Sequence, residues 1–452
     1  MTADSLRGRS VIVAGAGLAG LAAAVDLQNN GAAVTVLEAR ERVGGRVWTI
    51  HDGFRHGQHA EAGGDLIEDD HEDLKRLVTR EGLRLAPILR KGFGFVQQGG
   101  HGRPIKTANS LGQPWKKLTA LLHPMIHAYR LGEGAWESPV IKSLAATSVT
   151  DWIEDVQPDA DICAMACSLR GFFLSDPDQL SLLPLVEQVA AGNPAQPTRF
   201  FRIKGGNDRL PLALTKRLGE RVKRQSVLVA VNQSRSKVQA TVRDAQRQHA
   251  QIRADYLILA LPVTALRRIT FKPALPPEQR QAILRLNYGP ATKTLIQFTR
   301  RFWRKRGRPL AYGTDLPIGA IWDSNEEQRG PEGILTLLAG GSASAQTKKI
   351  LVARGIPGLL PHLKWLGGTK AQIIVSRVIS WTDDPWTGGG YAYFDPAFDP
   401  ALRPWLARVH GRCLFAGEHT SLRWQGYMTG AVESGLRAAA EVRALVRTGN
   451  RH

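Results

Sequence analysis

A glycine-rich turn near the N-terminus constrains the fold more than any other feature of this chain. Residues 11–20 read VIVAGAGLAG, and residues 34–37 form a second apolar run that Glu38 follows. This pattern predicts a strand, a tight turn, a helix and a second strand, with a diphosphate at the helix N-terminus. Gly17 is expected to let the backbone approach the diphosphate, and Gly20 to let the helix pack on the sheet. Because an acid after the second strand suits ribose hydroxyls, the sequence predicts a dinucleotide-binding unit.

Length and cysteine content narrow the class of protein. The chain has 452 residues, more than one hydrophobic core usually organises, so two domains are expected. No apolar run reaches the roughly 18–20 residues that cross a bilayer, so no membrane span is predicted. Three cysteines, Cys163, Cys167 and Cys413, argue against a disulfide framework and favour a reducing, cytoplasmic location. Cys163 and Cys167 lie in an apolar, helical stretch, where we expect them to be core residues.

The positive charge is concentrated in one part of the chain. The net charge is +20, and residues 199–308 alone hold 26 Lys and Arg against 5 Asp and Glu. Such a block attracts anionic partners. No zinc finger, helix-turn-helix or RNA-binding sheet motif accompanies it, so a solvated basic surface is expected and a nucleic-acid partner is not.

Later segments carry strand patterns that complete an α/β arrangement. They are 226–231 with 238–242, a hairpin; 256–261, a buried parallel strand; and 293–298 with 334–339, a second sheet. The chain closes with a strand over 413–416, a glycine and a helix over about 429–446. We expect this last strand to join the first sheet, so that its helix points toward the same ligand.

Six further segments give the chain a family resemblance. They are 38–46 (EARERVGGR), 62–66 (AGGDL), 203–206 (IKGG), 226–229 (SVLV), 415–420 (FAGEHT) and 426–431 (GYMTGA). In this order, together with the glycine turn, they resemble the flavin-dependent amine oxidase family, which includes monoamine, polyamine and L-amino acid oxidases. The resemblance covers nearly the whole chain and implies FAD rather than NAD as the cofactor.

The resemblance also implies which residues hold the cofactor. They are Gly15, Gly17, Leu18, Ala19, Gly20, Glu38, Ala39, Arg40, Gly45, Arg46, Gly63, Gly64, Asp65, Leu66, Leu228, Gly417, Glu418, Tyr427 and Met428. Monoamine oxidases attach FAD through a cysteine just before the first of two cage tyrosines. Gly390 occupies that position here, so a non-covalent flavin is expected. The histidines show no HxH or HExxH spacing, so no metal is predicted.

Four residues match the family's catalytic positions. The resemblance implies that Lys293 holds a water against flavin N5, that Trp381 packs near the flavin ring, and that Tyr391 and Tyr427 form an aromatic cage for the amine. A cation buried on an apolar strand needs a partner or a function. The alternative for Lys293 is an edge-strand lysine that points into solvent.

The segment after the Gly-Gly pair bears on the substrate. The related L-amino acid oxidases use an arginine here to hold the substrate carboxylate, but residues 65–71 are acidic and contain none. An acidic rim would favour a cationic amine. The interpretation we favour is that Asp69 or Asp70 caps the following helix. Arg170 or Arg423 could still bind a carboxylate from another loop.

The predicted fold is α/β, with a Rossmann-like FAD-binding domain of discontinuous segments and a substrate domain of mixed sheet and helices. We place the FAD-binding domain at 1–85, 205–290 and 385–452, and the substrate domain at 86–204 and 291–384.

The predicted activity is oxidation of the C–N bond of a primary or secondary amine by O2, giving an imine, then an aldehyde or ketone, with ammonia or a smaller amine and H2O2. Three alternatives stay open. They are an L-amino acid oxidase, a flavin desaturase or dehydrogenase acting on a carbon skeleton, and a non-catalytic flavoprotein that binds a polyanion through its basic block. The expected partners are a small amine and O2, and a homodimer is compatible with the sequence.

Overall fold

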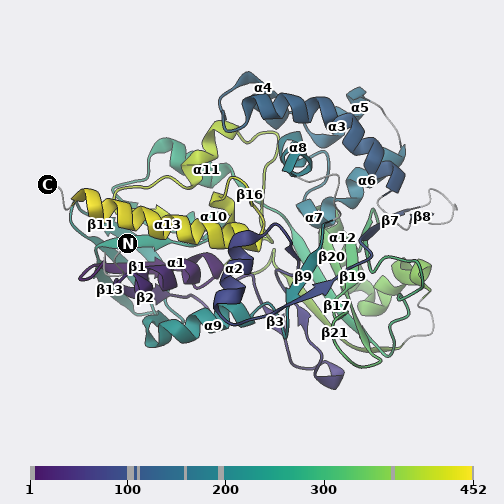
Figure 1. Ribbon diagram of the computed structural model, residues 1–452, viewed down its shortest axis with the longest axis horizontal. Helices are drawn as coiled ribbons and strands as arrows, with labels where there is room; N and C mark the ends of the chain where they lie inside the picture. Colours follow the sequence, from purple (N-terminus) through teal and green to yellow (C-terminus); the bar gives the residue numbers. More distant parts are fainter. Residues whose placement is uncertain are drawn as a thin grey trace.

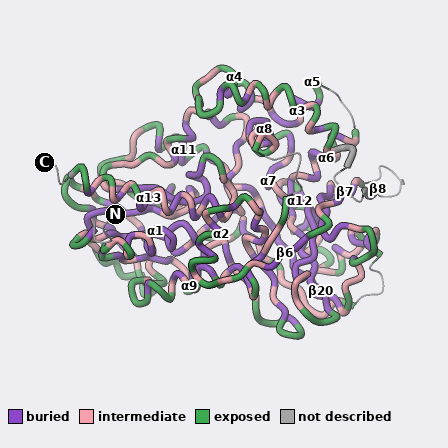
Figure 2. The backbone as a smooth tube through the Cα atoms, viewed as in Figure 1, coloured by how far each residue is buried: buried purple, intermediate pink, exposed green. Residues whose placement is uncertain are grey.

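The computed structural model describes residues 6–98, 106–108, 112–156, 160–191, 198–367 and 372–449. Figure 1 shows a mixed α/β protein in which the first helix, α1 (Leu18–Asn29), and the last helix, α13 (Met428–Gly449), lie side by side at one end. In Figure 2 the tube is mostly buried through α1 and through β20 (Gly333–Gly340), and mostly exposed along the rim. The α/β class predicted from the sequence is confirmed.

A five-stranded parallel sheet carries the N-terminal glycine turn. Its strands, in spatial order, are β10 (Val222–Lys223), β2 (Ala33–Leu37), β1 (Ser10–Ala14), β14 (Tyr256–Leu259) and β23 (Cys413–Phe415). The final strand therefore joins the first sheet, as expected, with β14 between it and β1. All four residues of β14 are buried, which explains the continuous apolar run in its sequence.

A four-stranded sheet lies next along the chain. Its strands, in spatial order, are β13 (His249–Ala254), β12 (Val238–Arg243), β11 (Val227–Gln233) and β15 (Thr270–Lys272). β11 and β12 form the predicted antiparallel hairpin. The inward residues of this sheet join the outer face of the parallel sheet in one hydrophobic cluster.

A seven-stranded sheet occupies the other end of the molecule. Its spatial order is β21 (Ile373–Ser380), β17 (Ala291–Phe298), β20, β19 (Ala320–Asp323), β18 (Ala311–Thr314), β7 (Phe93–Gln97) and β8 (Lys106–Ala108). β17 pairs antiparallel with β20 and β21, and all eight of its residues are buried. Lys293 thus lies on an internal strand, and the alternative of a solvent-facing edge lysine is wrong.

Three small sheets connect these larger ones. They are β5 (Ile67–Glu68), β9 (Phe200–Ile203) and β6 (Leu85–Ile88); β3 (Thr49–Ile50) with β4 (Ala60–Glu61); and β16 (Asn287–Tyr288) with β22 (Ala392–Tyr393). Segments assigned to different predicted domains share the first of these sheets. The domain bounds stay a prediction.

Helices cover the sheets. Besides α1 and α13 they are α2 (Glu72–Arg80), α3 (Gly112–Gly132), α4 (Pro139–Ala146), α5 (Val149–Val156), α6 (Ala160–Ser168), α7 (Arg170–Phe173), α8 (Leu182–Ala191), α9 (Arg209–Leu218), α10 (Val263–Leu266), α11 (Pro277–Arg285) and α12 (Ser342–Arg354). Short 3₁₀ helices span Arg55–Gly57, Gly219–Arg221, Ile356–Leu366, Pro400–Leu402, Pro404–Leu406 and Glu418–Thr420. Among the described residues, every helix is too short or too polar to cross a bilayer.

One core prediction on α6 is wrong. Cys163 is exposed and Cys167 is half-buried, although both lie on a helix as expected. The helix turns Ile162, Met165 and Ala166 toward the core, and its 3.6-residue period places Cys163 on the opposite face.

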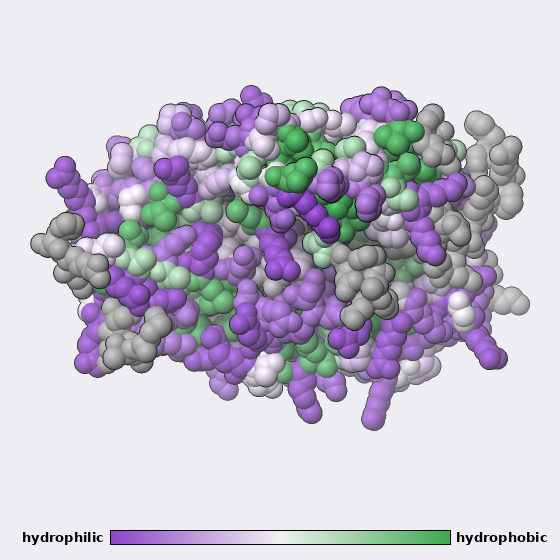
Figure 3. All heavy atoms as spheres, turned by 45° about the horizontal axis from the view of Figure 1, so that its top comes forward, coloured by the Kyte–Doolittle hydropathy of each residue, from purple (hydrophilic) through white to green (hydrophobic). Residues whose placement is uncertain are grey.

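On the side of the molecule drawn in Figure 3, apolar residues form small separate groups among hydrophilic ones.

Candidate active site

The glycine turn between β1 and α1 has the geometry of an anion-binding cradle. A Cβ at Gly20 would lie 1.9 Å from the Gly15 carbonyl oxygen, so only glycine lets the helix approach this closely. Gly17, the N-cap of α1, provides no side-chain cap for the helix, and a Cβ built on it meets no atom of the described residues within 4 Å. Free N–H groups and open space at a helix N-terminus fit a diphosphate.

Glu38 lies at the end of β2 beside this turn. Its carboxylate oxygens accept hydrogen bonds from the backbone N–H groups of Ala16 and Arg40, both at 2.9 Å. Burial raises the pKa of Glu38, and the two backbone hydrogen bonds and the charge of Arg40 oppose that rise. The carboxylate is therefore oriented by the backbone at the position predicted to meet a ribose, next to Ala39 at the strand's end.

The arginines that follow are tied to the C-terminal half of the chain. Arg40 makes a bidentate ion pair with Asp384, at 2.7 and 2.6 Å. Arg46 donates to the Gly390 carbonyl oxygen at 2.7 Å and to Glu418 at 2.9 Å. These contacts fasten residues 38–46 onto the segments that carry the other predicted cofactor residues.

The remaining predicted cofactor residues are distributed over several parts of the fold. Leu18 and Ala19 are buried in the first turn of α1, and a Cβ at Gly45 would lie 3.4 Å from the Cα of Gly17. Leu66 packs beside the cluster under the seven-stranded sheet, while the Leu228 side chain lies in the core between the first two sheets. Gly417, with φ +133°, donates its N–H to Ser434 Oγ at 2.9 Å.

Two of the four predicted catalytic residues, Lys293 and Trp381, meet at the loop formed by residues 62–65. Lys293 Nζ donates to the Gly63 carbonyl oxygen at 3.0 Å, and the Trp381 indole donates to that of Ala62 at 2.9 Å. A Cβ at Gly64 would lie 2.9 Å from the sulfur of Met428. Strands from the seven-stranded sheet and the start of α13 thus converge on one stretch of backbone.

Tyr391 packs beside the hydrophobic cluster that contains Trp381, and Tyr427 directly precedes Met428 in the chain. The Tyr391 hydroxyl donates to the Phe172 carbonyl oxygen, and the Tyr427 hydroxyl accepts from Gln188 at 3.3 Å. Burial raises the pKa of both hydroxyls, and the charge of Tyr391 adds to the rise at Tyr427. Their parallel stacking as a cage stays a prediction.

The acidic segment before α2 does not cap that helix. The N-cap of α2 is His71, without a side-chain cap bond, so the prediction that Asp69 or Asp70 caps it is wrong. Instead the His71 ring accepts from the Glu68 N–H at 3.1 Å, and Asp69 pairs with Arg199 at 3.1 Å. The α2 N-terminus is therefore without a side-chain cap from Asp69 or Asp70.

Two of these acids act on the cage region. Burial, and then Asp70 and Asp69, raise the pKa of Glu68 to about 7. The charges of Glu68 and Asp70 also raise the pKa of the Tyr427 hydroxyl. A carboxylate oxygen of each lies within 4.8 Å of a ring nitrogen of His71, which packs against Tyr427. The fully buried His71 packs edge-on against Tyr427, with ring centroids 5.2 Å apart. Glu68, Asp70 and His71 also form the one group of metal-ligand atoms within 4.8 Å of one another that the described residues contain.

The two arginines considered for a substrate carboxylate have other contacts. Arg170 is buried and donates to the carbonyl oxygens of Asp315 at 2.6 Å and Leu316 at 3.0 Å. Arg423 stacks over Trp424, 4.8 Å from the ring centroid. The Arg170 guanidinium is thus used in contacts within the protein.

One buried charged residue beside the site was not predicted from the sequence. Arg202 on β9 is 2% exposed and forms an ion pair with Asp65 at 2.5 Å. The available signal was a lone arginine inside an apolar strand, FFRI, since a cation there requires a buried partner. Trp322, which donates to Asp65 at 2.8 Å, carried no comparable signal.

Glu61 lies behind Asp65, and its titration predicts a pH effect on stability. Burial and the charge of Asp65 raise its pKa to about 8, from an ordinary value of 4.5. Between these values the unfolded chain gives up the proton and the folded protein keeps it, so Glu61 destabilises the fold progressively from pH 4.5 to 8.

We therefore expect Glu61→Gln to gain free energy of unfolding relative to wild type over this window, by about 1 kcal/mol per pH unit, and to level off above it. Urea unfolding between pH 5 and 9 measures this. The same substitution at the exposed Glu137 is the control. A difference between Glu61→Gln and wild type that stays constant with pH would refute the assignment.

Comparison with known proteins agrees with the geometry. Residues 18–443 match the family described as flavin containing amine oxidoreductase. The chain is 28% identical over 473 residues to amine oxidase [flavin-containing] A of Bos taurus, covering 98% of this chain and 86% of that protein. It is 26% identical over 461 residues to the L-amino acid oxidase of Bothrops pictus, covering 96% and 90%.

Solved structures share the fold. Cyclohexylamine oxidase from Brevibacterium oxydans gives a TM-score of 0.85 at 23% identity, covering 97% of this chain and 99% of that one. Wild-type putrescine oxidase bound to putrescine gives 0.83 at 24% identity, covering 96% and 99%. Since the family match spans nearly all of its length, this chain belongs to the flavin-containing amine oxidoreductase family.

Proposed function

We propose that the protein is an FAD-dependent oxidase that acts on the C–N bond of a primary or secondary amine. The observation that carries the proposal is the convergence of Lys293, Trp381 and Met428 on the backbone at 62–65. Tyr391 packs beside the cluster that contains Trp381, and Tyr427 precedes Met428. These residues come from segments far apart in the chain, so their meeting at one loop supports a common role.

FAD is the flavin that the cradle favours. The uncapped start of α1 suits its diphosphate, and the oriented Glu38 suits the ribose of its adenosine. Gly390 has no nucleophile, and a Cβ there would lie 2.4 Å from a methyl of Leu174. A cysteine at this position would need the Leu174 side chain to move, and the glycine that is present supports non-covalent binding.

Non-covalent binding predicts that acid precipitation releases the whole flavin. We expect a yellow supernatant and a colourless pellet, because only hydrogen bonds, ion pairs and packing hold the cofactor. Absorbance of both fractions near ~450 nm is the measurement. Flavin retained in the washed pellet would contradict this expectation.

The residues of the site can place and desolvate an amine. The half-buried tyrosines present ring faces to an amine and exclude water from it. When bound, the flavin supplies the oxidising chemistry, taking two electrons and hydrogen from the substrate and passing them to O2. Buried Lys293 places a positive charge at the loop expected to face the flavin, where it stabilises negative charge that develops during the reaction.

The overall reaction is then RCH2NH2 + O2 + H2O → RCHO + NH3 + H2O2. A general base is not needed if the amine enters neutral. Activity should consequently rise as pH increases above 7, toward the pKa of the amine.

The charge beside the cage favours an amine without a carboxylate. Glu68 and Asp70 lie near the Tyr427 ring, and Arg170 is held by backbone carbonyls. The negative charges of these side chains would repel an incoming carboxylate.

The three free cysteines suit a reducing compartment such as the cytoplasm.

An anaerobic titration tests the proposal. Monoamines, diamines and L-amino acids are added one at a time while the flavin absorbance is followed, and air is then admitted. Bleaching by amines, with recovery and peroxide in air, is expected. Bleaching by L-amino acids alone would support the amino acid oxidase alternative, and no bleaching by either class would overturn the proposal.

A further inference from the structure

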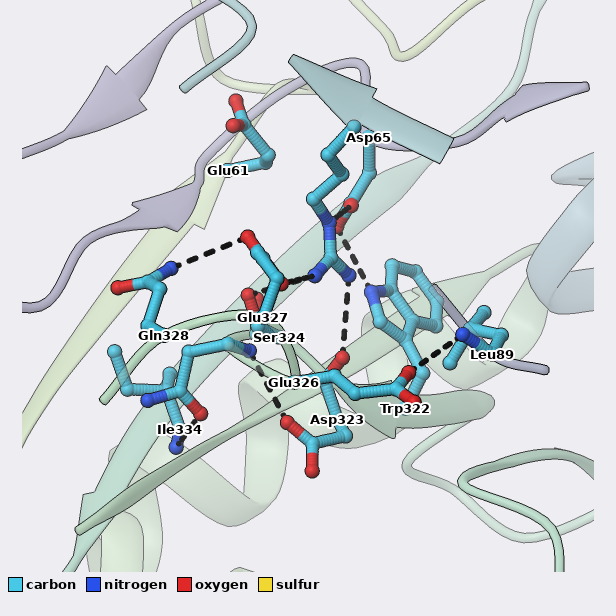
Figure 4. Close-up of polar contacts among 12 residues, drawn as sticks. Glu61, Asp65, Leu89, Trp322, Asp323, Ser324, Glu326, Glu327, Gln328 and Ile334 are labelled. Atoms are coloured by element: carbon cyan, nitrogen blue, oxygen red, sulfur yellow. Dashed lines mark hydrogen bonds and ion pairs between the residues drawn. The ribbon is translucent and has the colours of Figure 1, made fainter. Parts of the chain in front are cut away.

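Asp65 is the centre of a buried charged cluster next to the site. It is 7% exposed, and both its carboxylate oxygens are used. Oδ1 accepts from Arg202 Nε at 2.5 Å, while Oδ2 accepts from Lys293 Nζ at 3.1 Å and from the Trp322 indole at 2.8 Å. Figure 4 shows Asp65 and the Trp322 indole directed at each other. Asp65 thus joins the predicted catalytic lysine to Arg202.

Arg202 is held in place by three further contacts besides Asp65. Its guanidinium donates to the carbonyl oxygens of Ser324 at 2.9 Å and Asp323 at 3.1 Å, and forms an ion pair with Glu327 at 3.2 Å. These acceptors lie at the end of β19 and on the chain that follows it (Figure 4). Because Arg202 is anchored at three points, it holds Asp65 in one orientation.

The Lys293 ammonium is constrained in turn. Two of its three N–H groups go to the Gly63 carbonyl oxygen and to Asp65, the two acceptors that the described residues offer. The Nζ atom also lies 5.1 Å from the centroid of the Trp322 ring. One N–H therefore remains for a further partner at the Gly63 loop.

The charges around Lys293 have opposing effects on its protonation. Burial lowers the pKa of Lys293 most, and the charge of Arg202 lowers it further. Asp65, through its charge and its hydrogen bond, and the carboxyl of Glu61 raise it. Asp65 is thus the directly bonded anion that favours the ammonium form.

We propose that Asp65, held by Arg202, is a positioning residue that keeps Lys293 protonated and aimed at the Gly63 loop. This inference rests on the role proposed above for Lys293. Asp65 matches a cofactor-binding position of the family. If the proposal holds, its side chain contributes by orienting Lys293 and not by contacting the cofactor.

The test compares Asp65→Asn with wild-type holoprotein in the oxidative half-reaction. The rate constant for reoxidation by O2 is measured by stopped flow between pH 6 and 10, and the midpoint potential of the flavin by dye equilibration. In the variant, Lys293 loses its counter-anion and is neutral at lower pH. The descending limb of the rate profile should move down by about one pH unit or more, and the potential at pH 8 should fall.

Two variants separate this role from a structural one. Glu327→Gln removes another carboxylate from Arg202 without touching Lys293, and it should keep the wild-type profile. Asp65→Asn leaves Arg202 with one anion fewer and so risks misfolding. The double variant D65N/R202Q removes both charges of this ion pair. Because the charge of Arg202 lowers the pKa of Lys293, the double variant should shift the profile in the same direction as Asp65→Asn but by less.

The outcomes distinguish the two proposals. If Lys293→Met reoxidises slowly but neither Asp65 variant moves the profile or the potential, the positioning role of Asp65 is wrong and the role of Lys293 stands. If Lys293→Met reoxidises like wild type, the role of Lys293 fails, and this inference fails with it.

Discussion

Replacing Gly20 by alanine is expected to destabilise the protein by about 3 kcal/mol, while the same change at Gly17 should leave the apoprotein's stability unchanged. The added Cβ at Gly20 would lie 1.9 Å from the Gly15 carbonyl oxygen and 3.2 Å from Ala260 Cβ. Relief requires α1 to move off the sheet. At Gly17 a Cβ meets no described atom within 4 Å, and its φ of −77° suits any residue.

The cofactor should respond in the opposite way. Gly17→Ala puts a methyl group where the diphosphate is expected to approach the backbone, so the Kd for FAD should rise about 10-fold or more. Urea unfolding of the apoprotein and FAD fluorescence quenching separate the two effects. Unchanged FAD affinity in Gly17→Ala would show that the diphosphate does not bind at this turn. An unchanged unfolding midpoint in Gly20→Ala would show that the helix is not closely packed there.

Exchanging Lys293 for methionine should slow reoxidation of the flavin by O2 about 100-fold, the usual effect of removing one preorganised charged donor. Methionine fills similar space, and Asp65 keeps Arg202 and the Trp322 indole as partners. The fold should therefore survive. The rate of anaerobic flavin reduction by the substrate should change less than the rate of reoxidation. The reason is that the lysine is expected to stabilise the negative charge that develops on O2 as it is reduced.

Stopped-flow measurement of both half-reactions checks this expectation. The matched control is Lys348→Met, which removes a lysine from α12 that forms a surface ion pair with Asp383 at 2.7 Å. Equal slowing of both half-reactions in Lys293→Met would indicate a distorted site, and it would argue against a specific role in reoxidation.

Much of the fold was predictable because its strands leave strong local patterns. The run at 256–261 is apolar throughout because β14 is buried on both faces, and the hairpin at β11 and β12 alternates because one side faces a core. The need of Lys293 for a buried partner was predictable for a related reason. A lysine on a strand whose residues are all buried needs a partner.

What could not be predicted depends on three-dimensional contacts. Asp69 and Asp70 stand where helix-capping acids usually stand, yet the His71 ring takes the Glu68 N–H and changes the turn. Cys163 faces solvent because tertiary packing decides which side of α6 is covered. Arg202 and Asp65 are brought together by the pairing of β5 with β9, which no local signal specifies.

The strand order of the five-stranded sheet has a consequence for synthesis of the protein. β1 and β2 leave the ribosome first, but β14, the other neighbour of β1, begins at residue 256, and β23 begins at residue 413. Helix α13, which packs on α1, comes last of all. One apolar edge of β1 therefore stays unpaired in the nascent chain until β14 has been made, and an unpaired strand edge of this kind is prone to aggregation, against which chaperones protect.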